Sequence, residues 1–403
     1  MKRIYIFILL AFLTSSLSFS QATLSKDAQI SLMTVGQWSG EVYALFGHTA
    51  IRVKDDSIQL DEVYNYGYFD DTKPNFMVKF IQGKTDYVLG VVPYKFFVRE
   101  YTKKGVEIKE QIINLSDKEK QNLYNSLFIN ALPENCGYRY NYFFDNCATR
   151  PRDMIEKGIH GKIIYPSDDA KKQSLRDLVH ESLHSFPWSE FGTDLLLGKG
   201  ADSIVVLRTK MFLPIYLKNS FEGATVRNDS LSYKLAESSQ LIVPQNDKIN
   251  DLSYHKTFFT PFNVGILVLI ISIVISIIQF FGKSKTLLPK VFDTILFATA
   301  GTAGLIIFFL MFFSVHPTVQ NNWNFAWLNV FALIFAPLFW VKSARKAVNY
   351  YHFINFVILI SFILFWKLIP QNLPMASIPF SMSLMVRSGA NYFSNRNKTV
   401  KNY

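Results

Sequence analysis

The segment YNYFFDNCATRPRDMIEKG, residues 140–158, contains one of only two cysteines in the 403-residue chain. A strand-like aromatic run leads into Cys147, and the helix-forming run after it ends at a glycine, the residue that most often closes a helix. Asp145 or Asn146 can cap this helix, while Pro151 removes an early backbone donor and makes the first turn irregular. The segment therefore places Cys147 at or near a helix N-terminus, directly after an extended stretch.

The sequence before this segment alternates between apolar and polar residues, which predicts strands. HTAIRVKDD, beginning at His48, has the period of a half-buried strand. Further strand candidates are residues 58–70, 85–94 and 105–115. Ser116 and Glu119 form a capping-box pattern at the start of a helix. Strands and helices in this arrangement predict an α+β domain.

The chain begins with features of an exported protein. Residues 1–20 carry two basic residues, an apolar run and then small residues, which is typical of a secretory signal peptide. We therefore predict an exported domain over residues 21–261, where the two cysteines would meet an oxidising compartment. The net charge of +11 gives no indication of nucleic-acid binding, because much of the excess lies in short loops between apolar segments.

Residues 262–386 predict an all-α transmembrane domain of four or five helices, and residues 387–403 a cytoplasmic tail. The apolar segments are about 262–281, 291–314, 325–341 and 348–369, with a shorter one over 373–386. Basic residues alternate between the loops as the positive-inside rule requires, which predicts a multi-pass membrane protein with its globular domain on the exported side.

Three polar positions in this half need an interpretation of their own. Asp293 lies near the start of the second apolar segment, where we expect it to cap the helix or reach the interface. His316 and Trp323 lie in the loop over residues 315–324, which faces the exported side. Trp323 is typical of an interfacial anchor, and either residue is a candidate to contact a substrate in the outer leaflet.

Cys147 has the surroundings of a nucleophile. A helix N-terminus and nearby cations such as Arg150 and Arg152 favour a thiolate by lowering the thiol pKa. A cysteine nucleophile also needs a base, and His48 at the start of a strand is the best-placed histidine. Asn65, on the following strand, is a candidate to orient its ring.

Two other interpretations use the same residue types. Cys136 and Cys147 can form a structural disulfide in an oxidising compartment. The sequence HESLH, His180 to His184, matches the H-E-x-x-H zinc pattern, with Glu181 as the base. Pro187 ends that helix soon afterwards, and no clear third ligand follows.

Several motifs in order resemble the Lnb N-terminal periplasmic domain family over about residues 25–200. They are GHTAIRV, YNYGYFD, PNFMVKFIQGKTDYVL, YRYNYFFDNCATRPRD and PWSEFGTDLLLG. The resemblance implies a circularly permuted papain-like fold of the NlpC type, in which the histidine precedes the cysteine, and carries the catalytic roles to His48 and Cys147. Lnb proteins are linked to lipoprotein N-acylation, and HESLH is not part of the family pattern.

With these features, the resemblance implies a lipoprotein N-acyltransferase that needs no cofactor or metal, in the bacterial inner membrane with its catalytic domain in the periplasm. Its acyl donor would be a membrane phospholipid, its intermediate a Cys147 thioester, and its acceptor the α-amine of a diacylglyceryl-cysteine lipoprotein. Arg150, Arg152 and Arg52 are candidates to hold the phosphate. The alternatives are a cysteine peptidase or amidase acting on peptidoglycan peptides, and a non-catalytic binding protein with its cysteines bonded.

Overall fold

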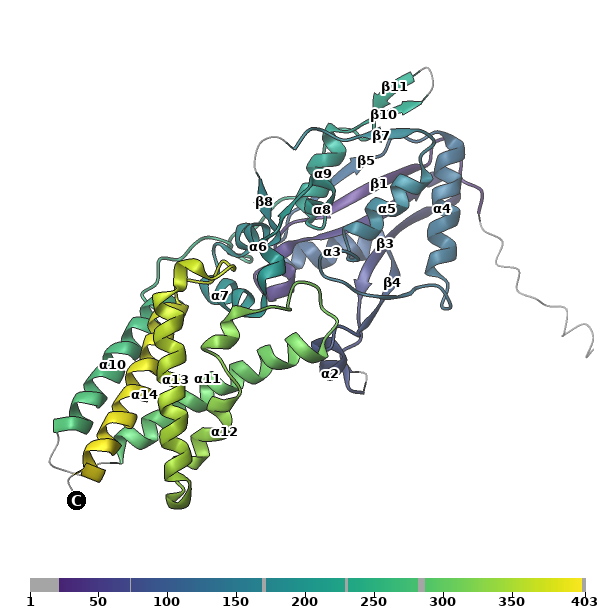
Figure 1. Ribbon diagram of the computed structural model, residues 1–403. Coiled ribbons are helices and arrows are strands. Elements are labelled where there is room, and N and C mark those ends of the chain that lie inside the picture. The colour runs from purple at the N-terminus through teal and green to yellow at the C-terminus, as the bar shows by residue number, and fades with distance from the viewer. Residues whose placement is uncertain (1–21, 73, 169–171, 229–230, 282–286, 401–403) are drawn as a thin grey trace, which may run out of the picture.

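The computed structural model describes residues 22–72, 74–168, 172–228, 231–281 and 287–400. Figure 1 shows a sheet-containing N-terminal domain and a helical C-terminal domain that meet along one side. The predicted signal peptide, residues 1–20, lies outside the described residues.

A seven-stranded antiparallel sheet forms the centre of the N-terminal domain, in the order β12-β5-β1-β2-β3-β4-β6. The strands are β1 (Gln29–Val35), β2 (His48–Asp55), β3 (Leu60–Tyr68), β4 (Asp86–Pro93), β5 (Ile108–Ile112), β6 (Gly137–Arg139) and β12 (Gln240–Val243). The four strands predicted upstream of residue 116 are present as β2 to β5. The aromatic run before Cys147 is strand only over β6, and the rest of it turns.

Helices cover both faces of this sheet. Helices α4 (Asp117–Ala131) and α5 (Thr149–Gly158) pack on one face, where Ile51 and Tyr64 of the sheet join their apolar side chains in one core. Helix α3 (Tyr94–Lys104) packs on the other face against Ala50 and Val63. The predicted capping box is confirmed, because the Ser116 and Glu119 side chains each accept from the backbone of the other.

The chain after α5 wraps the end of the sheet and then returns to it. These elements are β7 (Lys162–Ile164), β8 (Gln173–Ser174), α6 (Leu175–Leu183), α7 (Pro187–Leu196), β9 (Ile204–Val205), α8 (Leu207–Lys210), α9 (Pro214–Gly223), β10 (Thr225–Asn228) and β11 (Leu231–Lys234). Strand β12 then closes the edge of the main sheet beside β5. A second short sheet has the order β11-β10-β7.

The C-terminal domain is a helical bundle. Its helices are α10 (Pro261–Phe281), α11 (Leu288–Phe313), α12 (Phe331–Leu338), α13 (Arg345–Leu364) and α14 (Ser377–Val400). Within the described residues, three helical stretches are long and apolar enough to cross a membrane: Pro261–Phe281, Leu288–Phe313 and Lys342–Leu364. The predicted segment 325–341 is a shorter apolar stretch, Trp323–Leu338.

The last helix differs from the prediction, which ended the apolar segment at residue 386. Helix α14 continues to Val400, and Arg387 within it is completely buried. Its guanidinium pairs with Asp293, with Nε 2.6 Å from Oδ1. Asp293 therefore neither reaches the interface nor caps α11. Arg387, which the prediction placed at the start of a cytoplasmic tail, is compatible with the bundle interior because its charge has a buried partner in Asp293.

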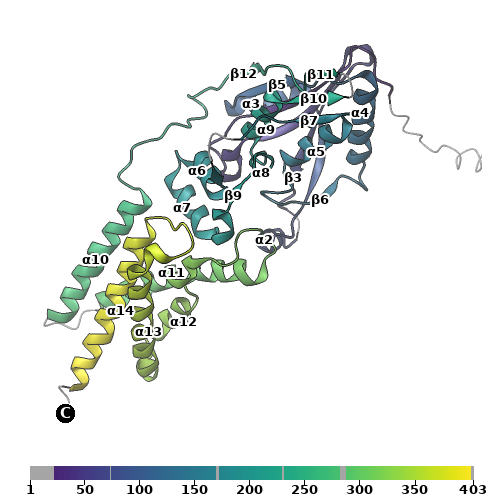
Figure 2. The same ribbon diagram turned by 45° about the horizontal axis from the view of Figure 1, so that its top comes forward.

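Hydrogen bonds join the two domains. On one side lie the end of α7 and the loop after it, and on the other lies the loop over residues 315–324. Asn322 Nδ2 donates to the Leu195 carbonyl at 2.8 Å, and Gly198 N–H donates to the Thr318 carbonyl at 2.7 Å. Asn324, fully buried, also donates to the Asp194 carbonyl. These contacts hold the sheet domain against one end of the helical bundle, and Figure 2 shows α7 beside that end.

Candidate active site

Cys147 lies in the irregular turn just before α5, held there by Asn146. The Asn146 side-chain oxygen accepts from the N–H groups of Ala148 and Thr149, both at 2.9 Å. Its amide nitrogen donates to the carbonyls of Tyr142 and Phe212, also both at 2.9 Å. Asn146 is buried with its donors and acceptor all engaged, so the position of Cys147 is fixed from both sides. The predicted helix cap at Asp145 or Asn146 is not found, because the N-cap of α5 is Ala148 and has no side-chain cap; Asn146 instead holds the turn before the helix.

The surroundings of the sulfur favour a neutral thiol. Burial raises the pKa of the Cys147 thiol to about 11, and hydrogen bonds from the backbone N–H groups of Thr49 and of Cys147 itself oppose this only in part. The residue nevertheless keeps a partly exposed surface. The direction of this shift is opposite to the one expected from the helix N-terminus and the arginines, because burial of the sulfur penalises the charged form.

His48 comes directly before Thr49 on β2, and its ring is hydrogen bonded to Asn65. His48 opens β2 directly before Thr49, whose N–H reaches the sulfur. Its Nε2 is 3.2 Å from Asn65 Oδ1, while Asn65 Nδ2 faces the Val63 carbonyl at 3.5 Å. With Nε2–H donating to Asn65, Nδ1 is the ring nitrogen free to accept a proton. Burial lowers the pKa of His48, so the ring is a neutral base at pH 7.

A glycine allows the cysteine to approach β3 closely. Gly67 has φ +104°, and a Cβ placed there would lie 3.5 Å from the Cys147 Cβ. The register of β3 with β4 shifts between Tyr66 and Tyr68, so a bulge surrounds this residue. Positive φ is accessible to glycine at little cost and strains other residues. The bulge therefore brings the end of β3 next to the sulfur.

Tyrosines surround this end of the sheet, and sequence reasoning missed them. Burial chiefly, with smaller contributions from neighbouring titratable groups that include Cys147, raises the pKa of Tyr87 to about 12 and raises those of Tyr101 and Tyr140 well above the ordinary value. Tyr138 is affected in the same way. Their phenols are therefore neutral, and their rings form an apolar rim. The aromatic spacing in TDYVLG and YRYNYFF was the available signal, but it indicated strands and not a site.

The three arginines proposed to hold a phosphate have partners within the fold. Arg150 pairs with Asp145 through two hydrogen bonds and lies over the Tyr138 ring. Arg152 is buried, pairs with Asp153 and donates to the Arg208 carbonyl. Arg52 binds both Asp61 and Glu110 and lies over Tyr94, with its side chain 11% exposed. Their phosphate-binding role remains a prediction, and each already contributes to holding the domain together.

The competing interpretations of the cysteine and histidine pairs find no support in the geometry. Both cysteines are free, and the Cys136 thiol faces the Pro133 carbonyl. His180 of HESLH is hydrogen bonded to Asp194, with Nε2 2.9 Å from both carboxylate oxygens. Among the described residues, no group of three or more His, Cys, Asp or Glu side chains is arranged to hold a metal.

His316 and Trp323 contact protein elsewhere in the structure. His316 Nε2 is 2.7 Å from the Phe80 carbonyl, on the short helix α2 (Phe76–Ile81) between β3 and β4. Trp323 is partly exposed, and its backbone N–H donates to Gln371. Their predicted contact with substrate remains untested, but His316 connects the helical bundle to a segment that leads toward Cys147.

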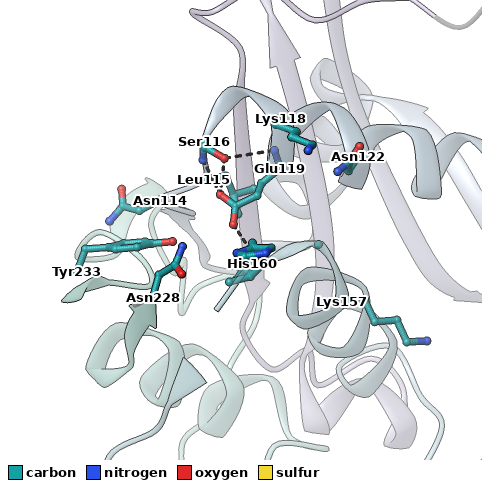
Figure 3. A pocket seen from close by; sticks show the side chains of 12 residues that line it. Asn114, Leu115, Ser116, Lys118, Glu119, Asn122, Lys157, His160, Asn228 and Tyr233 are labelled. Atoms are coloured by element: carbon teal, nitrogen blue, oxygen red, sulfur yellow. Dashed lines mark hydrogen bonds between the residues drawn. The ribbon is translucent and has the colours of Figure 1, made fainter. Parts of the chain in front are cut away.

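A separate surface hollow of about 790 Å³ lies away from Cys147, between the start of α4, the end of α5 and the short second sheet. Figure 3 shows that Glu119 and His160 face one another there. The Glu119 carboxylate accepts from Ser116 and from the His160 backbone N–H, which holds its pKa below the ordinary value despite partial burial. Glu119 therefore serves the helix cap, and this hollow contains none of the candidate catalytic residues.

Comparison with known protein families agrees with this organisation. Residues 18–177 match the Lnb N-terminal periplasmic domain, and residues 253–399 match the Lnb transmembrane domain. Searches of curated proteins and of solved structures returned no match. The two matched domains follow one another in the order found in the structure, so the chain belongs to the Lnb family: a membrane protein with a periplasmic domain, of a family linked to lipoprotein processing.

Proposed function

We propose that this protein is a lipoprotein N-acyltransferase of the bacterial inner membrane that works through a Cys147 thioester. Two contacts support the proposal: the N–H of Thr49, the residue after His48, reaches the Cys147 sulfur, and His48 Nε2 is 3.2 Å from Asn65 Oδ1. Both substrates of such a reaction are lipid-anchored, and a domain held against a membrane bundle is where they can meet.

The first half-reaction consumes the phospholipid. The Cys147 sulfur attacks the ester carbonyl of an acyl chain while its proton passes to His48 Nδ1, so that a free thiolate is never required. The backbone N–H groups of Thr49 and Cys147, already near the sulfur, are the candidate donors to the developing oxyanion. The C–O bond then breaks, the imidazolium returns its proton to the leaving oxygen, and a lysophospholipid departs.

The second half-reaction transfers the chain to the lipoprotein. The α-amine of a diacylglyceryl-cysteine attacks the thioester carbonyl and gives a proton to His48. The C–S bond breaks, and the proton returns to sulfur to regenerate the thiol. Asn65 acts as a positioning residue in both halves, because it fixes which ring nitrogen faces the sulfur. Arg52, Arg150 and Arg152 need no part in this scheme.

The same proposal extends to the fold and the topology. The order of His48, on β2, before Cys147, in the turn that leads into α5, supports a permuted papain-like domain of the NlpC type. The three apolar stretches and the long α14 support a multi-pass arrangement, with the sheet domain in the periplasm.

The test uses the full chain reconstituted with acyl-labelled phospholipid. We expect label on Cys147 in a hydroxylamine-sensitive thioester, and its transfer to the N-terminus of a diacylated lipopeptide. Cys147→Ser should abolish both, whereas the matched control Cys136→Ser should retain both. An absence of labelled thioester in single-turnover experiments with wild type, combined with cleavage of peptidoglycan peptides, would replace the acyltransferase with the peptidase.

A further inference from the structure

The short helix α2 exposes apolar side chains in an unusual place. It lies in the segment that connects β3 to β4, and Met77, Val78 and Phe80 are 64%, 51% and 45% exposed. Contiguous apolar side chains on an otherwise polar domain mark a surface that meets a partner or a membrane.

The position of α2 decides between these possibilities. Val315 N–H donates to the Gln82 carbonyl at 2.9 Å, and His316 holds the Phe80 carbonyl. These contacts come immediately after Phe313, where the candidate membrane span α11 ends. Figures 1 and 2 both show α2 beside that end of α11. Because α11 leaves the apolar layer there, α2 lies at the depth of the membrane interface.

A series of aromatic rings leads from α2 into the domain. It consists of Phe80, Phe76, Phe69, Tyr87 and Tyr140, with successive ring centroids 6.1, 5.6, 5.1 and 4.1 Å apart. Phe69, in the middle of the series, lies two residues after Gly67, where a Cβ would lie 3.5 Å from the Cys147 Cβ. The apolar surface at the membrane and the surroundings of the sulfur are therefore continuous.

We propose that α2 is embedded in the membrane interface and that this series of rings guides one acyl chain of a phospholipid from the bilayer to Cys147. The inference rests on the proposed function and deepens it by assigning the route of the donor. The ester carbonyl would reach the sulfur while the chain lies along the rings back toward the bilayer. Apolar rings suit a methylene chain, since each buried methylene gains about 0.8 kcal/mol on leaving water.

Membrane contact of α2 is tested without any catalysis. A single cysteine, Val78→Cys, is introduced into full-length protein carrying Cys136→Ser and Cys147→Ser, and labelled with an environment-sensitive fluorophore. In vesicles of phosphatidylethanolamine and phosphatidylglycerol we expect blue-shifted emission that shallow doxyl lipids quench. The matched control Leu231→Cys, on the exposed strand β11, should emit as in water. Water-like emission at position 78 overturns the inference.

The route is tested by comparing two kinds of acylation. Met77→Gln with Val78→Gln should slow thioester formation from vesicle phospholipid at least about ten-fold, because two apolar side chains lose their membrane contact. Reaction of Cys147 with a water-soluble short-chain ester should be unchanged, and Leu231→Gln should alter neither rate. Wild-type rates from vesicles in the double variant overturn the inference and leave the proposed function intact. Membrane-embedded α2 with no lipid-derived thioester in wild type overturns the function instead.

The ring series has its own variant. Phe69 is a partly exposed ring in the middle of the series, so Phe69→Ala removes a step with little effect on the core. We expect it to reduce the preference for long-chain over short-chain donors. A variant that slows both donors equally would show that Phe69 supports the fold and not the route.

Discussion

The buried pair between Asp293 and Arg387 gives a prediction whose size follows from the contacts. Arg387 is completely enclosed and donates to the Asp293 carboxylate twice, at 2.6 and 2.9 Å. It also donates to Ser276 at 2.8 Å and to Gln279 at 2.6 Å. Asn391 completes the shell around the carboxylate at 2.7 Å. The pair therefore joins α10, α11 and α14 inside the bundle.

Removal of either partner leaves the other charge without compensation in a medium that solvates it poorly. Breaking a buried pair in this way costs about 3–5 kcal/mol, whereas replacing both partners with apolar residues of similar size is close to neutral. We therefore expect Arg387→Met and Asp293→Leu each to lower the free energy of unfolding by about 3–5 kcal/mol. The combined variant should recover most of that loss.

The assay is unfolding of the detergent-solubilised full chain in a titration of a denaturing detergent, followed by tryptophan fluorescence. Arg345→Met, at an exposed arginine at the start of α13, is the matched control and should change the unfolding midpoint little. Single variants that unfold like the control would refute the reasoning. A combined variant as unstable as the sum of the singles would refute it as well, because the losses would then come from packing and not from an unpaired charge.

Three further predictions concern the candidate site. Asn65→Asp should retain the contact to His48 but stabilise the charged ring. In wild type the acylation rate should fall below a pH lower than the usual histidine pKa of about 6.5, and in the variant this fall should occur at higher pH. A fall at an unchanged pH would exclude this pairing. Alkylation of Cys147 by iodoacetamide should be slow at neutral pH and rise through about pH 11, and a fast reaction at pH 7 would indicate a thiolate. Gly67→Ala should cost about 1–3 kcal/mol of stability through its positive φ and slow acylation by crowding the sulfur, which thermal unfolding and thioester yield will measure together.

Local patterns in the sequence were sufficient for most of the sheet. Alternation from His48 predicted β2, and the Ser116–Glu119 capping box predicted the start of α4, because both signals depend on residues close together in the chain. Such features depend on contacts between residues close in the chain, so they can be predicted from the sequence directly.

The properties that depend on long-range packing were not predictable in this way. The sequence indicated a lowered pKa for Cys147 because the helix start and Arg150 were visible, while the enclosing strands were not. Asp293 and Arg387 are 94 residues apart, so each was interpreted alone, as an interfacial residue and as the start of a tail. In the first case burial raises the thiol pKa, and in the second it makes an ion pair necessary. In both cases the burial comes from segments distant in the chain.

Desolvation of the candidate site also bears on what a thioester there would do. The features that keep Cys147 neutral, burial of the sulfur and a rim of uncharged tyrosines, also limit the access of water to an acyl group on its sulfur. A hydrolase needs water at this point, whereas an acyltransferase must exclude water and admit an amine. A raised thiol pKa, which would weaken a cysteine peptidase, is tolerable when His48 removes the proton during attack on a lipid ester. The chemistry of the desolvated sulfur and the proposed route for lipid along α2 therefore favour the same assignment.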